Sequence, residues 1–447
     1  MMAENHAQQF DSVIVGLGLS GLSCARYLAA RGETIAVADT RTSPPQLATL
    51  RSELPEVPVY LGDLAAAPLA NAGRLVISPG LSVDEPAISA ARAAGIPVMG
   101  DIELFSLVAT APIVAVTGAN GKSTVTSLVA DMARTAQQRV AAGGNLAPPA
   151  LDLLAAPDVD LYVLELSSFQ LETTYSLNAA AAVVLNISAD HMDRYDSMDD
   201  YAAAKTRIYA GDGVMVINQD DPLVAAMRRP DRDTLMFTLG DPGIDDSVFG
   251  IRNGWLVRGA QRLLPAAEMG MRGSHNLANA LAALALGSAI NLPMVAMLET
   301  LRRFSGLPHR CQWVANRHGA DWFDDSKGTN VGASVAAIEG LAGDSDVILI
   351  AGGDGKGADF SELAVAMIGR VHTAILLGRD AERIAAVIPE SITVLQVADM
   401  EAAVAAAVER AQAGDKVLLS PACASLDMFR DYKQRGEIFA AAVRALD

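Results

Sequence analysis

The chain has few cysteines and no long apolar run. Among its 447 residues the cysteines are Cys24, Cys311 and Cys423, and their odd number and irregular spacing argue against a disulfide framework or a zinc site. No segment approaches the roughly 20 consecutive apolar residues of a membrane span. Residues 1–11 also lack the basic-then-apolar order of a secretory signal. We therefore expect a cytoplasmic protein that is not inserted in a membrane.

Positive charge is also scarce. The chain has 34 Lys and Arg against 52 Asp and Glu, a formal net charge of −18. Nucleic-acid binding rests on clustered Lys and Arg, so we expect no nucleic-acid partner. A phosphate-bearing small ligand is still possible, because a few cations and backbone N–H groups can bind one phosphate.

Short β-branched runs alternate with alanine-rich, helix-periodic segments along most of the chain. This alternation is typical of α/β domains with parallel sheets. A strand followed by a glycine turn and a helix occurs near residue 12 and again near residue 113, and a third α/β block begins after residue 308. The stretch 231–272 is more irregular and is predicted to be rich in β-structure. We therefore expect three domains, at 1–100, 101–306 and 307–447.

The first glycine motif is Gly16-Leu-Gly18-Leu-Ser-Gly21, with Asp39 at the end of the next expected strand. Its context, after a strand and at the start of a helix, matches the dinucleotide-binding fingerprint. The motif by itself does not distinguish NAD, and hence an NAD-dependent oxidoreductase, from a UDP-sugar. A tight turn without any ligand is the alternative.

The second glycine motif, Gly118-Ala-Asn120-Gly121-Lys122-Ser123-Thr124, follows an expected strand at 113–117. Its N–H groups can cradle phosphates, Lys122 can reach the terminal phosphates, and the Ser123 hydroxyl can bind Mg²⁺. The usual spacing would place a glycine where this chain has Val116, so the loop is a tighter variant. The motif predicts a nucleotide-phosphate site.

Later strands are expected over 161–165 and 182–186, and polar residues at or just after their ends are candidates for metal ligands. Glu165 ends an apolar strand and could hold Mg²⁺ beside the phosphates, or could only cap the following helix. His191 lies between Asp190 and Asp193, a setting that favours a second ligand. Lys205 is in an alanine-rich helix where residue chemistry alone predicts an exposed cation, since an ammonium cannot ligate a metal.

These segments, together with 306–310, 325–331, 352–356 and 419–426, resemble the Mur ligase family, and most closely its D-glutamate-adding branch. They occur in the family's order over nearly the whole chain, and 165–174 and 420–427 are the most specific. The resemblance implies an α/β fold with a Rossmann-like N-terminal domain, a central P-loop ATPase-type domain and a Rossmann-like C-terminal domain.

The resemblance also implies an activity in peptidoglycan precursor synthesis. The enzyme would be an ATP-dependent ligase that joins D-glutamate to UDP-N-acetylmuramoyl-L-alanine through an acyl phosphate, releasing ADP and phosphate. The nearest alternatives are sister ligases that add L-alanine or diaminopimelate, or that build folate polyglutamate, because they share the central domain. We expect a monomer.

The positions of residues in the motifs give the site residues that the resemblance implies. The UDP substrate would contact Leu19, Ser20, Asp39, Thr40, Arg41, Asn145 and Ser167. ATP would contact Gly118, Asn120, Gly121, Lys122, Ser123, Thr124, Asn279, Arg310 and Asp325. Two Mg²⁺ ions would be held by Ser123, Glu165, His191 and Lys205, the lysine as a carbamate. D-Glutamate would contact Lys327, Thr329, Lys356, Ser425 and Tyr432. The catalytic residues would be Lys122, His191 and Lys205.

Overall fold

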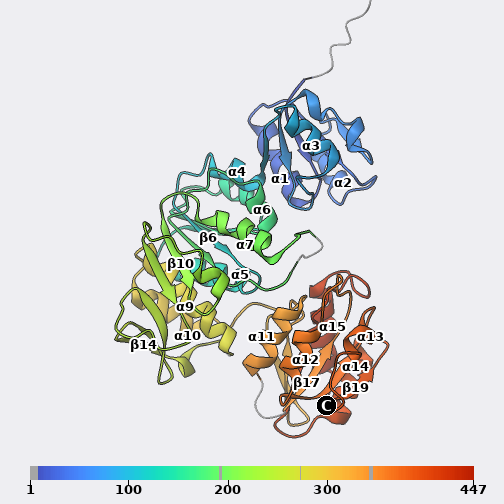
Figure 1. Ribbon diagram of the computed structural model, residues 1–447. Helices are drawn as coiled ribbons and strands as arrows, with labels where there is room; N and C mark the ends of the chain where they lie inside the picture. The colour runs from blue at the N-terminus through green and yellow to red at the C-terminus, as the bar shows by residue number, and fades with distance from the viewer. Residues whose placement is uncertain (1–8, 191–193, 272, 342–345, 447) are drawn as a thin grey trace, which may run out of the picture.

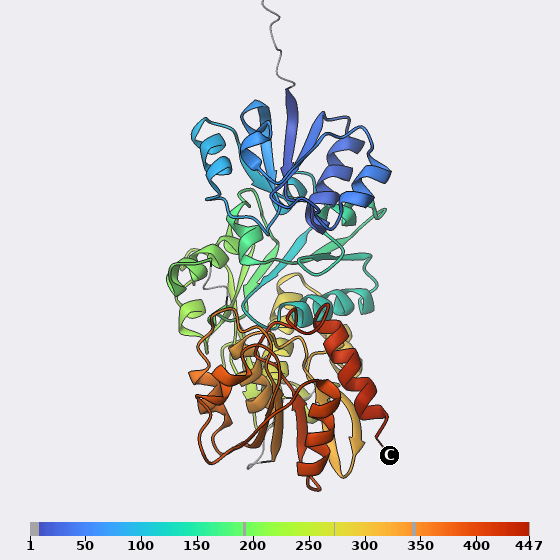
Figure 2. The ribbon, with the colours of Figure 1, turned by 90° about the vertical axis from the view of Figure 1, so that its right-hand side faces the viewer.

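The computed structural model describes residues 9–190, 194–271, 273–341 and 346–446. Three α/β domains follow one another along the chain, each built on its own sheet. Figures 1 and 2 show the central domain (green and yellow) between the N-terminal domain (blue) and the C-terminal domain (orange and red). The predicted fold class is thus confirmed.

The N-terminal sheet is wholly parallel, in the order β3-β2-β1-β4-β5. Its strands are β1 (Phe10–Val15), β2 (Ile35–Asp39), β3 (Val59–Leu61), β4 (Ala72–Ile77) and β5 (Val98–Gly100). Its helices are α1 (Leu19–Ala30), α2 (Leu47–Glu53) and α3 (Pro86–Ala93). The chain adds β2 and β3 on one side of β1 and then β4 and β5 on its other side, so the order of strands reverses between β1 and β4. Sheets of this kind bind ligands in the crevice at such a reversal, beyond the carboxyl ends of the strands.

The central sheet has nine strands, in the order β14-β13-β12-β11-β10-β9-β6-β8-β7. They are β6 (Ile113–Thr117), β7 (Val140–Gly144), β8 (Leu161–Glu165), β9 (Ala181–Val184), β10 (Val214–Asn218), β11 (Thr234–Phe237), β12 (Val248–Arg252), β13 (Trp255–Arg258) and β14 (Gln261–Pro265). Only β12, β13 and β14 pair antiparallel, and with β11 they form the β-rich stretch predicted at 231–272.

Helices cover both faces of the central sheet, as the apolar character of its strands requires. They are α4 (Asp101–Ser106), α5 (Lys122–Thr135), α6 (Ser168–Glu172), α7 (Met198–Thr206), α8 (Pro222–Ala225), α9 (Ser274–Ala289) and α10 (Met294–Arg303). Because β6, β8 and β9 are neighbours, the loops that follow them meet at one edge of the sheet.

The C-terminal sheet has the order β15-β16-β20-β17-β18-β19, and only the β15–β16 hairpin is antiparallel. Its strands are β15 (Gln312–Arg317), β16 (Ala320–Asp324), β17 (Val347–Ala351), β18 (Val371–Leu376), β19 (Thr393–Gln396) and β20 (Lys416–Leu419). Its helices are α11 (Val331–Leu341), α12 (Ser361–Met367), α13 (Ala381–Ala385), α14 (Met400–Arg410) and α15 (Tyr432–Arg444). Within the described part of the chain, no helix is both long and apolar enough to cross a membrane.

One strand boundary differs from expectation in a way that matters for the site. The sequence predicts a strand over 182–186, but β9 ends at Val184. Asn186 leaves the ladder, and its amide side chain instead binds the backbone of the second glycine loop. A β-branched run gives no signal for such a departure, because the bonding partner is 66 residues away.

Candidate functional site

The second glycine loop joins β6 to α5 in the predicted strand–turn–helix arrangement. Gly121 has φ +82°, and a Cβ at this position would overlap the side-chain oxygen of Asn279, so only glycine fits. Asn186, two residues beyond the end of β9, supports the loop: its Oδ1 accepts from Asn120 N at 2.8 Å, and its Nδ2 donates to Asn120 O at 3.1 Å. Asn186 is thus a site residue that the sequence assigned only to a strand.

Two lysine side chains converge on this loop. Lys122 Nζ donates to the carbonyl oxygens of Gly118 at 2.8 Å and Ala119 at 2.7 Å. Lys205 Nζ, from α7, donates to the same Gly118 oxygen at 3.1 Å. Lys205 is only 1% exposed, so the prediction of an exposed cation was wrong. Helical periodicity in an alanine-rich segment does not reveal which face is buried against the loop.

The environment of these lysines favours a neutral amine at Lys205. Its burial, and then the positive charge of Lys122, hold the pKa of Lys205 well below its usual range. Burial also lowers the pKa of Lys122, although Glu165 and Asp190 oppose this shift. A neutral amine is a nucleophile, whereas an ammonium is not.

Glu165 ends β8 and is 3% exposed. Its Oε1 accepts from Asn145 Nδ2 at 2.5 Å, whereas its buried Oε2 has no hydrogen-bond partner among the described residues. The cap of α6 is Ser167, which forms a capping box with Gln170. Glu165 therefore does not cap this helix. A buried carboxylate oxygen without a partner is costly and suits a hard cation, which prefers oxygen ligands.

His191 lies outside the described residues. In the described part of the chain, no group of three or more His, Cys, Asp and Glu side chains could by itself hold a metal ion.

A cavity of about 310 Å³ extends from the second glycine loop to the C-terminal domain. The predicted ATP residues that line it are Asn120, Gly121, Thr124, Asn279, Arg310 and Asp325. Lys327, which is predicted to contact D-glutamate, also lines the cavity. Four lining residues were not predicted to contact ATP from the sequence: Asn186, Asn218, Phe237 and His275. The cavity therefore includes residues from two domains.

Direct contacts join the C-terminal domain to the glycine loop. Arg310 Nη2 donates to Ser123 Oγ at 2.7 Å. Asp325 is buried and accepts from Ser420 Oγ at 2.7 Å and Cys311 N at 3.2 Å. Burial raises the pKa of Asp325 to about 7, so this carboxyl can change protonation near neutral pH.

The residues predicted for D-glutamate lie near the carboxyl ends of β16, β17 and β20. The loop with Lys356 and the loop with Ser425 are joined by a bridge between Asp354 and Ala424. Lys356 has φ +51°, a left-handed turn conformation. These loops follow β17 and β20, which are adjacent strands at a reversal of winding.

Lys327 and Tyr432, which are also predicted to contact D-glutamate, lie together. Lys327 Nζ is 4.3 Å from the Tyr432 ring centroid. Burial is the main cause that lowers the pKa of Lys327 to about 8, and the charge of Arg310 adds to it. Thr329 lies two residues later, and its N–H donates to Lys327 O at 2.8 Å. Through Lys327, these amino-acid candidates adjoin the 310 Å³ cavity.

The first glycine loop lies at the β1–β4 crevice. Asp39 is buried and accepts from Leu17 N at 2.7 Å and from Arg41 N and Nε, each at 2.8 Å. Leu19 is 61% exposed at the start of α1, and Thr40 follows Asp39 directly. Ser20 follows Leu19 in the first turn of α1 and is half-buried. The predicted Asn145 and Ser167 belong instead to the central domain, after β7 and β8.

Comparison with known proteins gives matches over most of the chain. Family models match residues 10–100 (Mur ligase MurD-like, N-terminal domain), 116–287 (Mur ligase middle domain) and 309–423 (Mur ligase, glutamate ligase domain). A UDP-N-acetylmuramoylalanine--D-glutamate ligase of Nitrosococcus oceani is 57% identical over 97% of this chain and 96% of its own. A ligase of the same name from Pseudomonas aeruginosa is 53% identical over 97% of this chain and 98% of its own.

A solved structure with the same fold is the UDP-N-acetylmuramate-alanine ligase of Thermotoga maritima. It is 18% identical, with a TM-score of 0.58 over 98% of this chain and 100% of that one.

Proposed function

Because this chain belongs to the Mur ligase family, we propose that it is an ATP-dependent ligase that joins D-glutamate to UDP-N-acetylmuramoyl-L-alanine, a step of peptidoglycan precursor synthesis. The name shared by relatives more than half identical over nearly its full length supports this substrate pair. The structural observation that carries the proposal is the convergence of Lys122 and Lys205 on the second glycine loop. We place the domain boundaries at 100/101 and 306/307.

The chemistry begins with activation of a carboxylate, which is a poor electrophile in water. The L-alanine carboxylate oxygen attacks the γ-phosphorus of ATP. A new O–P bond forms, the bond to the β-phosphate oxygen breaks, and ADP leaves. Lys122 offsets the charge of the transferring phosphoryl group.

The amine of D-glutamate then attacks the acyl carbon. A C–N bond forms, the C–O bond to phosphate breaks, and phosphate and one proton are released. Arg310 and Lys327 bring the C-terminal domain to the nucleotide cavity. A site closed in this way would protect the acyl phosphate from hydrolysis.

Four residues would hold two Mg²⁺ ions, namely Ser123, Glu165, His191 and a carbamate on Lys205. The Oε2 of Glu165, which has no hydrogen-bond partner within the described part of the chain, fits this role. Bound Mg²⁺ would neutralise phosphate charge. The depressed pKa of Lys205 fits carbamate formation, because the neutral amine attacks CO₂, forms an N–C bond and releases one proton. The carbamate thereby places an oxygen ligand at this buried position.

The UDP substrate would bind at the β1–β4 crevice. Backbone N–H groups of the first glycine loop at Leu19 and Ser20 would receive its phosphates. Asp39, Thr40 and Arg41 would contact the rest of the UDP. Asn145 and Ser167 would contact the substrate on the central-domain side. ATP would lie in the 310 Å³ cavity.

The activity itself is tested by leaving out one component at a time. ADP and phosphate should form only when ATP, Mg²⁺, UDP-N-acetylmuramoyl-L-alanine and D-glutamate are all present. Coupled detection of ADP and phosphate measures this. Equal turnover with L-glutamate, L-alanine or diaminopimelate in place of D-glutamate would contradict the substrate assignment.

The amino-acid pocket is tested by replacing Lys356 with alanine. D-Glutamate brings two carboxylates, so it needs cationic and hydroxyl donors such as Lys356, Thr329 and Ser425. Loss of a charge-assisted contact costs up to about 3 kcal/mol, so the KM for D-glutamate should rise by up to roughly 100-fold.

The KM values for ATP and for the UDP substrate should stay near those of the wild type. Arg410→Ala, an exposed change on α14, is the matched control. If Lys356→Ala raises only the KM for ATP, Lys356 does not belong to the amino-acid pocket.

A further inference from the structure

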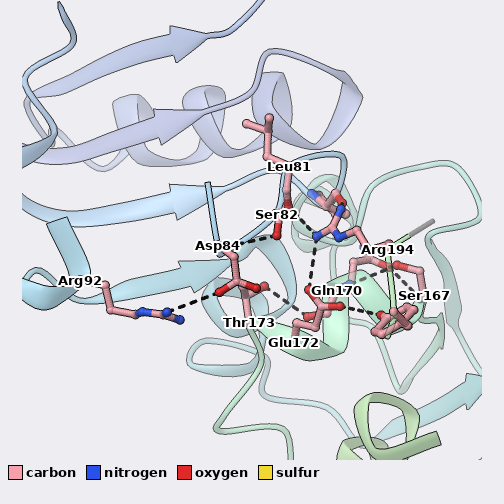
Figure 3. A network of polar contacts seen from close by, with 11 residues as sticks. Leu81, Ser82, Asp84, Arg92, Ser167, Gln170, Glu172, Thr173 and Arg194 are labelled. Atoms are coloured by element: carbon pink, nitrogen blue, oxygen red, sulfur yellow. Dashed lines mark hydrogen bonds and ion pairs between the residues drawn. The ribbon is translucent and has the colours of Figure 1, made fainter. Parts of the chain in front are cut away.

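Arg194 connects the central domain to the N-terminal domain. Its Nη2 donates to Leu81 O at 2.7 Å, and its Nη1 donates to Pro79 O at 3.3 Å. Its side chain is 17% exposed. Figure 3 shows the guanidinium between Leu81 on one side and Glu172 of α6 on the other. One side chain thus touches backbone of one domain and a helix of the next.

The two carbonyl oxygens belong to the loop that follows β4, at the crevice assigned to UDP. Ser78 N donates to Val15 O at 2.8 Å, and Leu81 N donates to Ser78 O at 3.0 Å. The loop lies directly on the first glycine loop, because a Cβ at Gly16 would come within 2.7 Å of Ser78 Cβ and 3.2 Å of Leu81 Cδ1. Moving Pro79 and Leu81 would therefore disturb the phosphate-binding turn.

On its other side Arg194 is fixed within the central domain. Glu172 Oε2 lies 3.3 Å from its Nη2, and Glu172 Oε1 accepts from Tyr195 OH at 2.5 Å. The guanidinium also lies 4.3 Å above the Phe169 ring. These partners hold the guanidinium in one orientation, which the bonds to the two carbonyl oxygens require.

The same cluster extends to Lys205. The Tyr195 ring packs against the Tyr201 ring at 5.1 Å between centroids, and Lys205 Nζ is 4.5 Å from the Tyr201 centroid. A continuous set of packed side chains therefore runs from Arg194 to the amine beside the second glycine loop.

We propose that Arg194 is a positioning residue that sets the N-terminal domain against the central domain, and so sets the separation between the UDP crevice and the Lys122–Lys205 site. This role rests on the proposed function, in which one substrate has its UDP in the crevice and its carboxylate beside Lys122. A misplacement of about 1 Å at the reacting atoms can cost roughly 100-fold in rate.

The planar guanidinium suits this task better than an ammonium would. Its donors form a rigid fork, so it can serve two carbonyl oxygens and one carboxylate together. Lysine at this position would keep the positive charge beside Glu172 but could not reproduce that geometry.

The test compares Arg194→Ala and Arg194→Lys with Arg92→Ala. Arg92 also carries a salt bridge in this region, to Asp84 at 3.6 Å, but both side chains are exposed. The first readout is hydrogen–deuterium exchange of the unliganded full chain, which does not depend on the reaction. Both Arg194 variants should exchange faster over 78–85 and 16–21, with Arg194→Ala the faster, whereas Arg92→Ala should match the wild type.

The second readout is kinetic. In Arg194→Ala, kcat/KM for the UDP substrate should fall by about tenfold or more, and the KM for ATP should remain near the wild-type value. Arg194→Lys should be intermediate, and Arg92→Ala should be normal.

Wild-type exchange over 78–85 in both Arg194 variants would overturn the proposal, and so would an equal rise in the KM values for ATP and the UDP substrate. If Arg194→Ala unfolds, Arg194→Lys decides by the same two readouts. An inactive wild type would count against the proposed function alone, since the exchange result stands by itself.

Discussion

Replacing Lys122 with alanine is expected to lower the rate of ADP formation by about 10²- to 10³-fold while the chain stays folded. The ammonium is placed on the second glycine loop by two bonds to carbonyl oxygens. It matters most as the phosphoryl group transfers, so kcat should fall more than substrate affinity.

The fold should survive this change because glycine conformation and Asn186 fix the loop independently of Lys122. Gly121 keeps its left-handed turn, and both Asn186 bonds go to the backbone of Asn120. Steady-state kinetics with melting curves would measure the two effects. Arg134→Ala, an exposed change at the far end of α5, is the control and should be normal. Near-normal activity in a folded Lys122→Ala variant would show that this loop is not the ATP site.

Replacing Lys205 with alanine is expected to abolish activity, and short carboxylates should restore part of it. The side chain is 1% exposed and lies beside the glycine loop, so its loss leaves a space next to Gly118 O. Acetate or propionate could place an oxygen where the carbamate would bind Mg²⁺. An added amine should not rescue, because a positive charge cannot ligate a metal.

Activity of Lys205→Ala is measured as phosphate release over a series of carboxylate concentrations. Arg207→Ala is the control, since Arg207 lies one residue beyond α7 and is exposed. It should be active without additive and insensitive to carboxylates. A density map of an active, nucleotide-bound crystal with an unmodified Lys205 would refute the carbamate.

Local features of this fold could be read from the sequence because each depends on neighbours along the chain. The strand–turn–helix around Gly118–Lys122 needs only an apolar run, glycines at special backbone angles and a helical continuation. The same reasoning placed Glu165 and Asp39 at strand ends. Parallel strands bring their carboxyl ends to one edge, so the loops after the neighbouring strands β6 and β8 meet at one edge of the central sheet.

The tertiary contacts of single side chains could not be predicted from the sequence in this way. Lys205 has the sequence context of a surface cation, and only its packing against the loop 87 residues earlier buries it and lowers its pKa. Asn186 extends an apolar run, yet it leaves the strand to bind the backbone of Asn120.

The sequence by itself determined three α/β blocks, two glycine loops and the strand-end acids, because periodicity and turn chemistry act over a few residues. Only the tertiary structure decided that Arg310 reaches Ser123 and that Arg194 reaches Leu81 O, bonds that span 187 and 113 residues. These pairings depend on how complete domains are oriented, and no local pattern of residues encodes that orientation.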